Sequence, residues 1–150
     1  MTLLTIDDLK NTQGAILGID PGTKTFGLAV SDSTRLIATP IETIRRKKFT
    51  PDAQKILALY ADRNCGACVI GFPINMDGSE GPRAQSVKDF ALNLQNIQDI
   101  PIFFWDERLS TAAVTRTLLE FDTSRAKRAA NVDKLAASYI LQGVLDRLRA

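Results

Sequence analysis

Residues 15–30 read AILGIDPGTKTFGLAV, two apolar runs separated by a short polar turn. The first run ends at Asp20, and Pro21 and Gly22 begin the turn. Proline presets φ near the turn value and glycine tolerates positive φ, so the pattern predicts a β-hairpin. Its first strand would deliver Asp20 to the strand end, where a ligand could reach it. Because a single Asp-Pro-Gly is most often an ordinary surface turn, other carboxylates must decide whether Asp20 is functional.

The remainder of the chain alternates apolar runs with helical patterns. Three consecutive strands followed by crossover helices predict an α/β fold, with one mixed five-stranded sheet, three strands antiparallel and then two parallel, flanked by helices. The predicted order is β-β-β-α-β-α-β-α-α. Further strands are expected at 35–44 (an edge or irregular strand, since Pro40 cannot donate to a ladder), 67–71 and 100–105.

Helix starts are predicted at Thr50, as an N-cap followed by proline, after residue 79, at Ser110 as a second cap, and near Val132. The polar and basic residues 121–132 are expected to form a mobile loop. Residues 1–14 are interpreted as an N-terminal extension with a short helical turn from Asp7 to Lys10, and residues 15–150 as one domain.

Composition excludes several kinds of chemistry. The 150 residues are 45% hydrophobic and 24% charged with a net charge of +2, typical of an ordinary globular protein. There is no histidine, which excludes imidazole acid–base catalysis and histidine-ligated metals. No membrane helix or secretory signal is recognised, so a cytoplasmic location without membrane partners is the default expectation.

Two acids follow the apolar run 100–105, and strand ends are where ligand crevices form in α/β sheets. Side chains alternate along a strand, so only one of Asp106 and Glu107 can face a given side. The residues alone leave open which one belongs to a site. The ordinary alternative is a charged turn, with Arg108 as the local ion-pair partner.

Asp133 precedes Ala136 and Ala137, the start of an apolar stripe, by three and four residues. This spacing places it on the inner side of the last helix, in the expected first turn. A helix-dipole acid or a cap are the alternatives. An inward carboxylate needs a partner, and a divalent cation shared with Asp20 would supply one. Oxygen ligands suit Mg²⁺ or Mn²⁺, and two such ions about 4 Å apart activate water in phosphodiester hydrolysis.

Basic and polar side chains cluster near the expected site. Residues 45–48, RRKK, form a compact basic run that suits either a solvated loop or phosphate contacts. The loop from Asn75 to Ser79 follows a strand and could shape a substrate groove. The expected nucleic-acid contacts are Lys24, Arg45, Arg46, Lys47, Lys48, Asn75, Ser79, Arg108 and Lys134.

The pair Cys65 and Cys68 has the spacing of a zinc or redox motif. Zinc would need two more ligands, and none are at hand. A redox pair sits at a helix start, whereas this one leads into a strand. Simple packing is the better interpretation.

Four ordered motifs make the chain similar to the YqgF/RuvX family, which has a ribonuclease H-like fold and is related to the resolvase RuvC. They are GIDPG at 18–22 with GLAVSD at 27–32, GFPINMDGS at 71–79, DERLST at 106–111, and VDKLAA at 132–137 with ILQ at 140–142. The chain departs from the usual pattern at Thr25-Phe26, in its longer N-terminus and in the basic segment 123–131.

The resemblance implies metal-dependent phosphodiester hydrolysis, with Asp20, Glu107 and Asp133 as catalytic metal ligands and Asp106 as a neighbour. It implies maturation of the 5′ end of the small-subunit ribosomal RNA precursor as the function. The alternatives are a Holliday-junction resolvase acting on four-way DNA and a non-catalytic RNA- or ribosome-binding factor. The expected partners are structured RNA or branched DNA, with ribosomal particles as a further partner, and the state is a monomer or homodimer.

Overall fold

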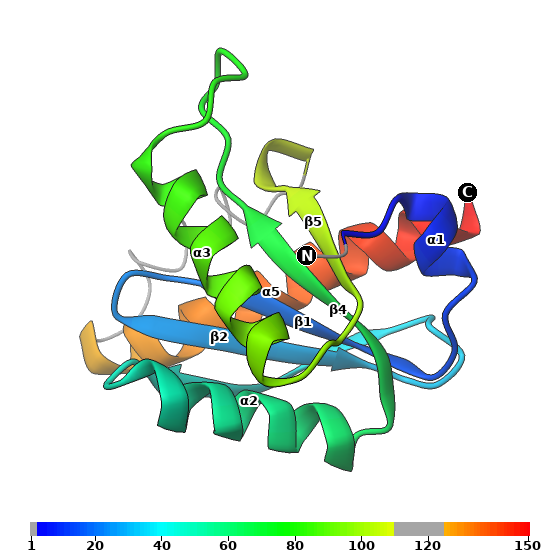
Figure 1. The fold of residues 1–150 in the computed structure, drawn as a ribbon, viewed down its shortest axis with the longest axis horizontal. Helices are drawn as coiled ribbons and strands as arrows, with labels where there is room; N and C mark the ends of the chain where they lie inside the picture. The colour runs from blue at the N-terminus through cyan, green and yellow to red at the C-terminus, as the bar shows by residue number, and fades with distance from the viewer. Residues whose placement is uncertain (1–2, 110–124) are drawn as a thin grey trace.

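The computed structural model describes residues 3–109 and 125–150, with side chains described for 3–109 and 134–150. One five-stranded sheet in the order β3-β2-β1-β4-β5 carries helices on both faces (Figure 1). The elements are α1 Ile6–Lys10, β1 Ala15–Pro21, β2 Thr25–Ser31, β3 Ala38–Arg45, α2 Phe49–Asp62, β4 Cys65–Phe72, α3 Pro82–Ile97, β5 Ile102–Asp106, η1 Glu107–Leu109 and α5 Arg125–Arg149.

The strand directions confirm the predicted mixed sheet. β1 and β2 form the antiparallel hairpin, β3 pairs antiparallel with β2, and β4 and β5 are parallel to β1. β3 is an edge strand, and its ladder shifts register where Ala29 pairs with Pro40. The edge position suits a residue that has no N–H to donate.

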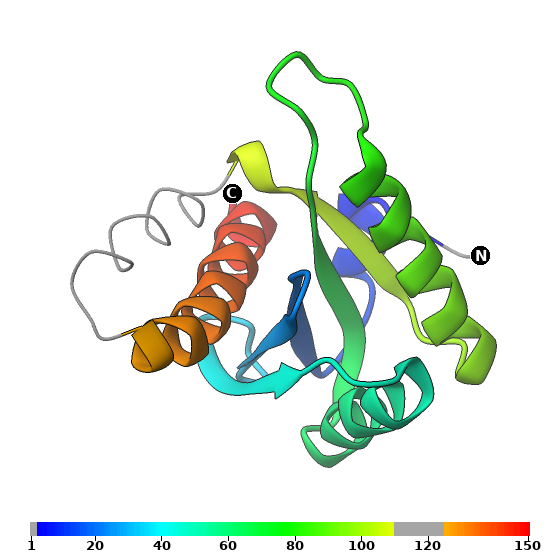
Figure 2. The same cartoon turned by 90° about the vertical axis from the view of Figure 1, so that its left-hand side faces the viewer.

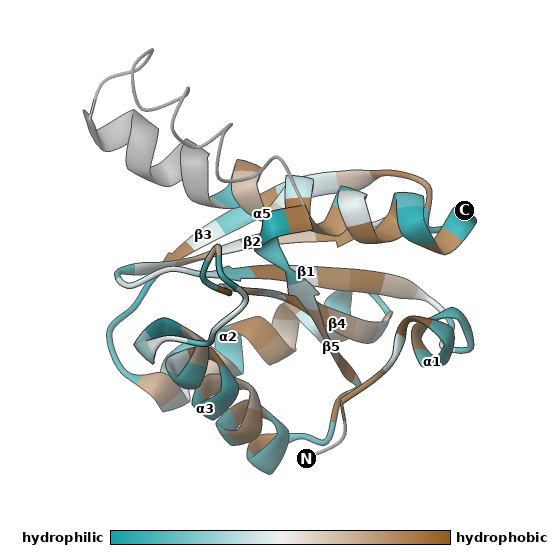
Figure 3. Ribbon diagram, turned by 90° about the horizontal axis from the view of Figure 1, so that it is seen from above, coloured by the Kyte–Doolittle hydropathy of each residue, from teal (hydrophilic) through white to brown (hydrophobic). Residues whose placement is uncertain are grey.

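Helices α2 and α3 cover one face of the sheet and α5 covers the other (Figure 2). Leu17 and Ile19 pack on the α2/α3 side, whereas Ile16 packs on the α5 side. Every residue of β1 is buried, because this central strand is covered on both faces. Hydrophobic residues accordingly run along the strands, and hydrophilic residues mark the outer turns of α3 (Figure 3). Burial on both sides explains why β1 is almost uninterrupted apolar sequence up to Asp20.

The segment before β1 packs on the domain. The predicted helical turn is confirmed as α1, and its Leu9 is fully buried. The backbone N–H of Leu4 donates to the carbonyl of Ile102 at 2.8 Å, beside edge strand β5. The Arg35 guanidinium donates to the carbonyls of Leu9 and Gly14 at 3.0 and 2.8 Å. These bonds tie both ends of the segment to the sheet.

β3 begins at Ala38 rather than at Arg35, because residues 32–37 form a turn. The Asp32 carboxylate accepts the backbone N–H groups of Leu36 and Ile37 at 2.8 and 3.0 Å. Arg35 has a φ of 60°, which no strand accommodates.

The predicted N-cap at Thr50 is wrong, because α2 begins at Phe49 and Lys48 occupies the cap. The buried Asp52 carboxylate accepts the backbone N–H of Lys47 at 3.0 Å and so orders the residues before the helix. The Phe49 ring meets the Phe90 ring edge-on, with centroids 6.2 Å apart. The helix therefore begins two residues earlier than a cap at Thr50 would place its start.

The predicted loop 121–132 is wrong over residues 125–132, because α5 begins at Arg125. Residues 125–130, RAKRAA, are strong helix formers, and their polarity masked that propensity. Residues 110–124, including the helix predicted from Ser110, lie outside the described residues. Within the described part of the chain, no helix is long and apolar enough to span a bilayer.

Candidate active site

Asp20 lies on β1 and is only 1% exposed. The direction of its side chain follows from Gly18, two residues earlier on the same strand. A Cβ atom at Gly18 would lie 3.0 Å from Cβ of Leu141 and 3.4 Å from the carbonyl oxygen of Ala137, both on α5. Because side chains alternate along a strand, Asp20 belongs to the α5 face.

Glu107 reaches the same face from the end of β5. A Cβ atom at Gly71 would lie 2.7 Å from Cδ1 of Ile140 and 2.8 Å from Oε1 of Glu107. The Glu107 carboxylate therefore occupies the space that a side chain on β4 would fill. β1 and β4 pair with Ile19 opposite Ile70, and the next step along both strands sets Asp20 beside Gly71. The structure thus brings two predicted acids to the same face of the sheet, Asp20 from β1 and Glu107 from the turn after β5, on either side of Gly71 on β4.

Asp106 is not part of this pair. Phe103 and Trp105 pack on the α5 side and Phe104 on the α2/α3 side, so alternation turns Asp106 toward α3. Its carboxylate accepts hydrogen bonds from Nε and Nη2 of Arg108 at 3.1 and 2.8 Å. The Arg108 guanidinium lowers the pKa of Asp106 by these bonds. The local ion pair considered from the sequence is therefore present.

The backbone of Asp133 lies inside α5, eight residues after its first residue, so its predicted place in the first turn is wrong. The carbonyl of Ala137, one turn later, lies against Gly18. Further along α5, Oε1 of Gln142 accepts, at 2.9 Å, the backbone N–H of Ala38, the first residue of β3, at the end of the sheet where β1 also begins. α5 therefore runs opposite to β1, and its backbone at 133 lies toward the strand end that carries Asp20. The Asp133 side chain is outside the described residues.

The donor set fits a hard divalent cation. Asp20 and Glu107 both offer carboxylate oxygens on one face, and the missing Cβ of Gly71 leaves room for the Glu107 carboxylate. Among the described side chains, no three histidine, cysteine or acidic groups gather around one point. A third ligand would have to come from a side chain such as that of Asp133, which the structure does not describe.

The predicted basic run lies beside the hairpin turn. The Arg46 backbone N–H donates to the carbonyl of Lys24 at 2.9 Å, and its guanidinium lies 4.5 Å from the centre of the Phe26 ring. The side chains of residues 45–48 and of Lys24 are exposed, and that of Lys134 is half-buried on α5. These cations surround the end of β1 from two directions.

The loop from Asn75 to Ser79 closes on itself and projects beyond the end of the sheet (Figure 1). The backbone N–H of Asn75 donates to the carbonyl of Ser79 at 2.9 Å, and the Ser79 hydroxyl donates to Asp77 at 2.6 Å. The Ser79 hydrogen bonds lower the pKa of Asp77. Nη1 of Arg108 reaches the Asn75 carbonyl at 3.5 Å. Asn75 and Ser79 thus hold the shape of a loop that stands next to the acids.

Both cysteines are free thiols, half-buried at Cys65 and fully buried at Cys68. Burial raises the pKa of Cys65 to about 11 and raises that of Cys68 further. Protonated thiols in the apolar core agree with the packing interpretation.

Arg83 was missed from the sequence. It lies in the first turn of α3, and its Nη2 donates to the carbonyl of Pro21 at 3.2 Å, directly after Asp20. Only the topology could have pointed to Arg83. Because β1 and β4 are parallel, the helix that follows β4 begins near the end of β1.

A mixed sheet of this topology, covered by helices on both faces, defines a ribonuclease H-like fold. The solved structure "T. thermophilus RuvC in complex with Holliday junction substrate" matches with a TM-score of 0.55 at 13% identity, over 91% of this chain and 97% of that chain. A second Thermus thermophilus RuvC structure matches with a TM-score of 0.52 at 15% identity, over 90% and 96%. At such identities the likeness concerns the fold.

The family itself follows from sequence. The family model "RuvX: Holliday junction resolvase" matches residues 14–147, so the chain belongs to the RuvX family, as its motifs predicted. A protein of Paramagnetospirillum magneticum named "Putative pre-16S rRNA nuclease" is 61% identical over 131 residues, 87% of this chain and 84% of the relative. One of the same name from Ruegeria sp. is 58% identical over 135 residues, 90% and 86% of the two chains.

Proposed function

We propose that this chain is a divalent-metal-dependent nuclease that hydrolyses phosphodiester bonds in the maturation of the 16S ribosomal RNA precursor. The single observation that carries the proposal is the placement of Asp20 beside Gly71, whose open face the Glu107 carboxylate fills. The names of the relatives that share about three-fifths of its residues support the substrate. Carboxylate chemistry also agrees with a chain that has no histidine.

In this proposal Asp20, Glu107 and Asp133 hold Mg²⁺ or Mn²⁺. When bound there, such ions would activate a water molecule and stabilise charge on the leaving oxygen. Asp20 serves as a fixed ligand because a buried strand holds its backbone on both sides. Glu107 sits on the short helical turn after β5 and either binds an ion or orients the attacking water. Asp106 acts indirectly, because it holds Arg108 beside the loop from Asn75 to Ser79.

The substrate would lie across the end of the sheet, where exposed cations meet the acids. Phosphate contacts are proposed for the predicted set, in which Arg108 is fixed by its ion pair and Lys134 approaches from α5. A cytoplasmic location is part of the same proposal, since precursor RNA is the substrate.

The deciding experiment compares cleavage of precursor 16S RNA by the wild type and Asp20→Asn with Mg²⁺ and with Mn²⁺. We expect the wild type to cleave and Asp20→Asn to lose roughly a hundredfold or more of the rate, because a required ligand becomes neutral. Asp62→Asn, an exposed acid at the end of α2, is the matched control and should keep full activity. Equal rates for the wild type and a folded Asp20→Asn protein would overturn the proposal.

A resolvase is the second candidate, and it is favoured by the match to the RuvX family, which is described as a Holliday junction resolvase. Resolution of a four-way junction requires two cuts, and therefore a homodimer with two sites, whereas RNA trimming is possible for a monomer. Preferential cleavage of a synthetic junction by a dimeric species would favour the resolvase. Tight RNA binding without metal-stimulated turnover would instead identify a non-catalytic ribosome-binding factor.

A further inference from the structure

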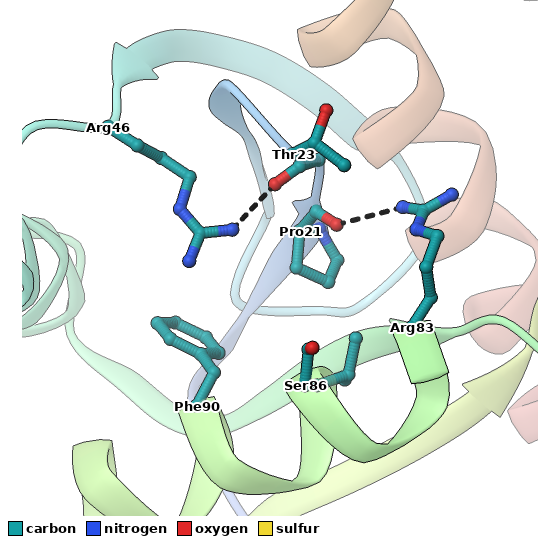
Figure 4. Close-up of a pocket in the computed structure, with 8 residues that line it drawn as sticks. Pro21, Thr23, Arg46, Arg83, Ser86 and Phe90 are labelled. Atoms are coloured by element: carbon teal, nitrogen blue, oxygen red, sulfur yellow. Dashed lines mark hydrogen bonds between the residues drawn. The ribbon is translucent and has the colours of Figure 1, made fainter. Parts of the chain in front are cut away.

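A pocket of about 330 Å³ lies beside the hairpin turn, on the α3 side of the sheet (Figure 4). Its volume is at the lower end of the range for small-ligand sites, about the size of one nucleotide unit. The lining residues are Pro21, Gly22, Thr23, Arg46, Arg83, Ser86, Val87 and Phe90. Two of them are arginines and none is acidic, so the pocket favours an anion.

The two guanidinium groups approach the turn from opposite sides (Figure 4). Nη1 of Arg46 donates to the carbonyl of Gly22 at 2.7 Å, and Nη2 of Arg83 donates to that of Pro21 at 3.2 Å. Those are the hydrogen bonds that the described residues provide to each group, so most of their N–H donors are left for a ligand. Each group is therefore positioned by the backbone in advance of binding, which reduces the entropy lost when a ligand arrives.

The other residues that line the pocket indicate which part of a ligand it could hold. Phe90 is buried and its ring stacks on Phe26 at 4.8 Å, so it offers an apolar edge rather than an open face for a base. Ser86 is exposed on the same helix, and its hydroxyl, which donates to the Pro82 carbonyl at 3.1 Å, would have to turn to donate to a ligand. Two forked cations with a hydroxyl and an apolar edge suit a phosphate with its attached sugar.

The position of the pocket relates it to the acids. Pro21 lines the pocket and directly follows Asp20, whose side chain faces the opposite side of the sheet. A strand that passes over the end of β1 would meet the acids on the α5 side and the arginines on the α3 side.

We propose that Arg46 and Arg83 together bind one backbone phosphate of the substrate strand, close to the phosphodiester that lies at Asp20. Arg46 belongs to the basic run expected to contact phosphates, whereas this pocket adds Arg83 as its partner and assigns both to one group. The inference deepens the proposed function and rests on it for the identity of the strand. It does not depend on turnover.

The test measures binding of a short single-stranded RNA without divalent ions, by fluorescence anisotropy across a series of salt concentrations. Arg46→Gln and Arg83→Gln should each weaken binding about tenfold, because each removes a charge-assisted contact. Each should also reduce the slope of log affinity against log salt by up to roughly 0.7, the value for one phosphate on a single strand. Arg63→Gln, an exposed arginine at the other end of α2, is the matched control and should bind like the wild type.

The double variant tests whether the two arginines share a phosphate. We expect its loss to be clearly smaller than the product of the two single losses, since removal of either loosens the same group. Independent, multiplicative losses would overturn the shared-phosphate assignment. Wild-type affinity in both single variants would overturn the pocket itself.

Competition separates a strand phosphate from a free one. Inorganic phosphate and a nucleoside monophosphate should displace the RNA only at concentrations far above those of the RNA. Tighter binding of the free mononucleotide would overturn the strand assignment. If the wild type never cleaves RNA but the Arg46 and Arg83 variants still bind RNA more weakly than the wild type does, the proposed function is refuted and this inference stands.

Discussion

Gly71 gives the candidate site its space. The Glu107 carboxylate lies against the place that a β-carbon at residue 71 would take, with only 2.8 Å between Oε1 and that position. The same position lies 2.7 Å from Cδ1 of Ile140 on α5. A side chain at 71 would therefore affect both the packing of the helix and the placement of the acid, and the two effects can be separated.

Gly71→Ala should destabilise the fold by about 1–3 kcal/mol through overpacking and slow cleavage by roughly a hundredfold through displacement of Glu107. Adding Ile140→Val removes the methyl group that causes the shorter contact. The double variant should regain thermal stability without regaining the cleavage rate, as measured by melting and by initial rates. Recovery of both together would show that Glu107 is not displaced and that the loss was purely structural.

For single residues, the sequence predicted part of what the structure brings together at the candidate site. Asp20 stood out because an apolar strand ended in a carboxylate. Strand alternation showed that the side chains of Asp106 and Glu107 must point to different faces of the sheet. Only the space above Gly71 and the Arg108 ion pair show which of the two faces α5. Arg83 carried no local signal, because its contact with Pro21 depends on how α3 docks.

The turn between β2 and β3 is an element whose stability depends on one charge. Asp32 accepts the backbone N–H groups of Ile37 and Leu36 and the hydroxyl of Thr34. With the Ile37 bond as the largest cause, these bonds lower the pKa of Asp32 to about 2 from an ordinary 3.8. This turn also positions Arg35, whose guanidinium donates to the carbonyls of Leu9 and Gly14 and so holds the N-terminal segment.

Because the pKa of Asp32 is lower in the folded chain, the folded state binds fewer protons at this carboxyl than the unfolded chain does. Its contribution to stability is complete above the ordinary pKa and is lost as the pH falls through about 2. The urea midpoint of the wild type should exceed that of Asp32→Asn at about pH 5, and the difference should shrink toward about pH 2. If the difference in urea midpoint between the two proteins does not change with pH, the stabilisation comes from the shape of the Asp32 side chain and not from its charge.

The sequence predicted the strands better than it predicted the start of the last helix. The hairpin, β4 and β5 were predicted because buried strands carry dense apolar runs between turn residues. The early start of α5 was missed, because residues 125–130 are basic yet favour helix. Asp133 consequently moves from a helix terminus into a helix interior, where a terminal cap no longer explains it.

In the whole molecule, the sheet brings segments that are far apart in sequence to the same end, where β1 and β5 both finish. β1 contributes Asp20, the turn after β5 contributes Glu107, and the backbone of α5 passes over the same end of β1. A divalent ion held between these elements would join parts of the chain that are far apart in sequence. Metal binding should therefore stabilise the fold as a whole, independently of any substrate.

Melting of the substrate-free protein tests this directly. A ligand at a hundred times its dissociation constant adds about 2.7 kcal/mol, which for a domain of this size raises the melting temperature by about 5–10 °C. We expect that rise for the wild type with Mg²⁺ or Mn²⁺, its reversal by a chelator, and its loss in Asp20→Asn and Glu107→Gln. Asp62→Asn should respond like the wild type, because its exposed carboxylate lies at the end of α2. An equal rise in all four proteins would assign the stabilisation to general ionic effects, and the acids over Gly71 would then not be a metal site.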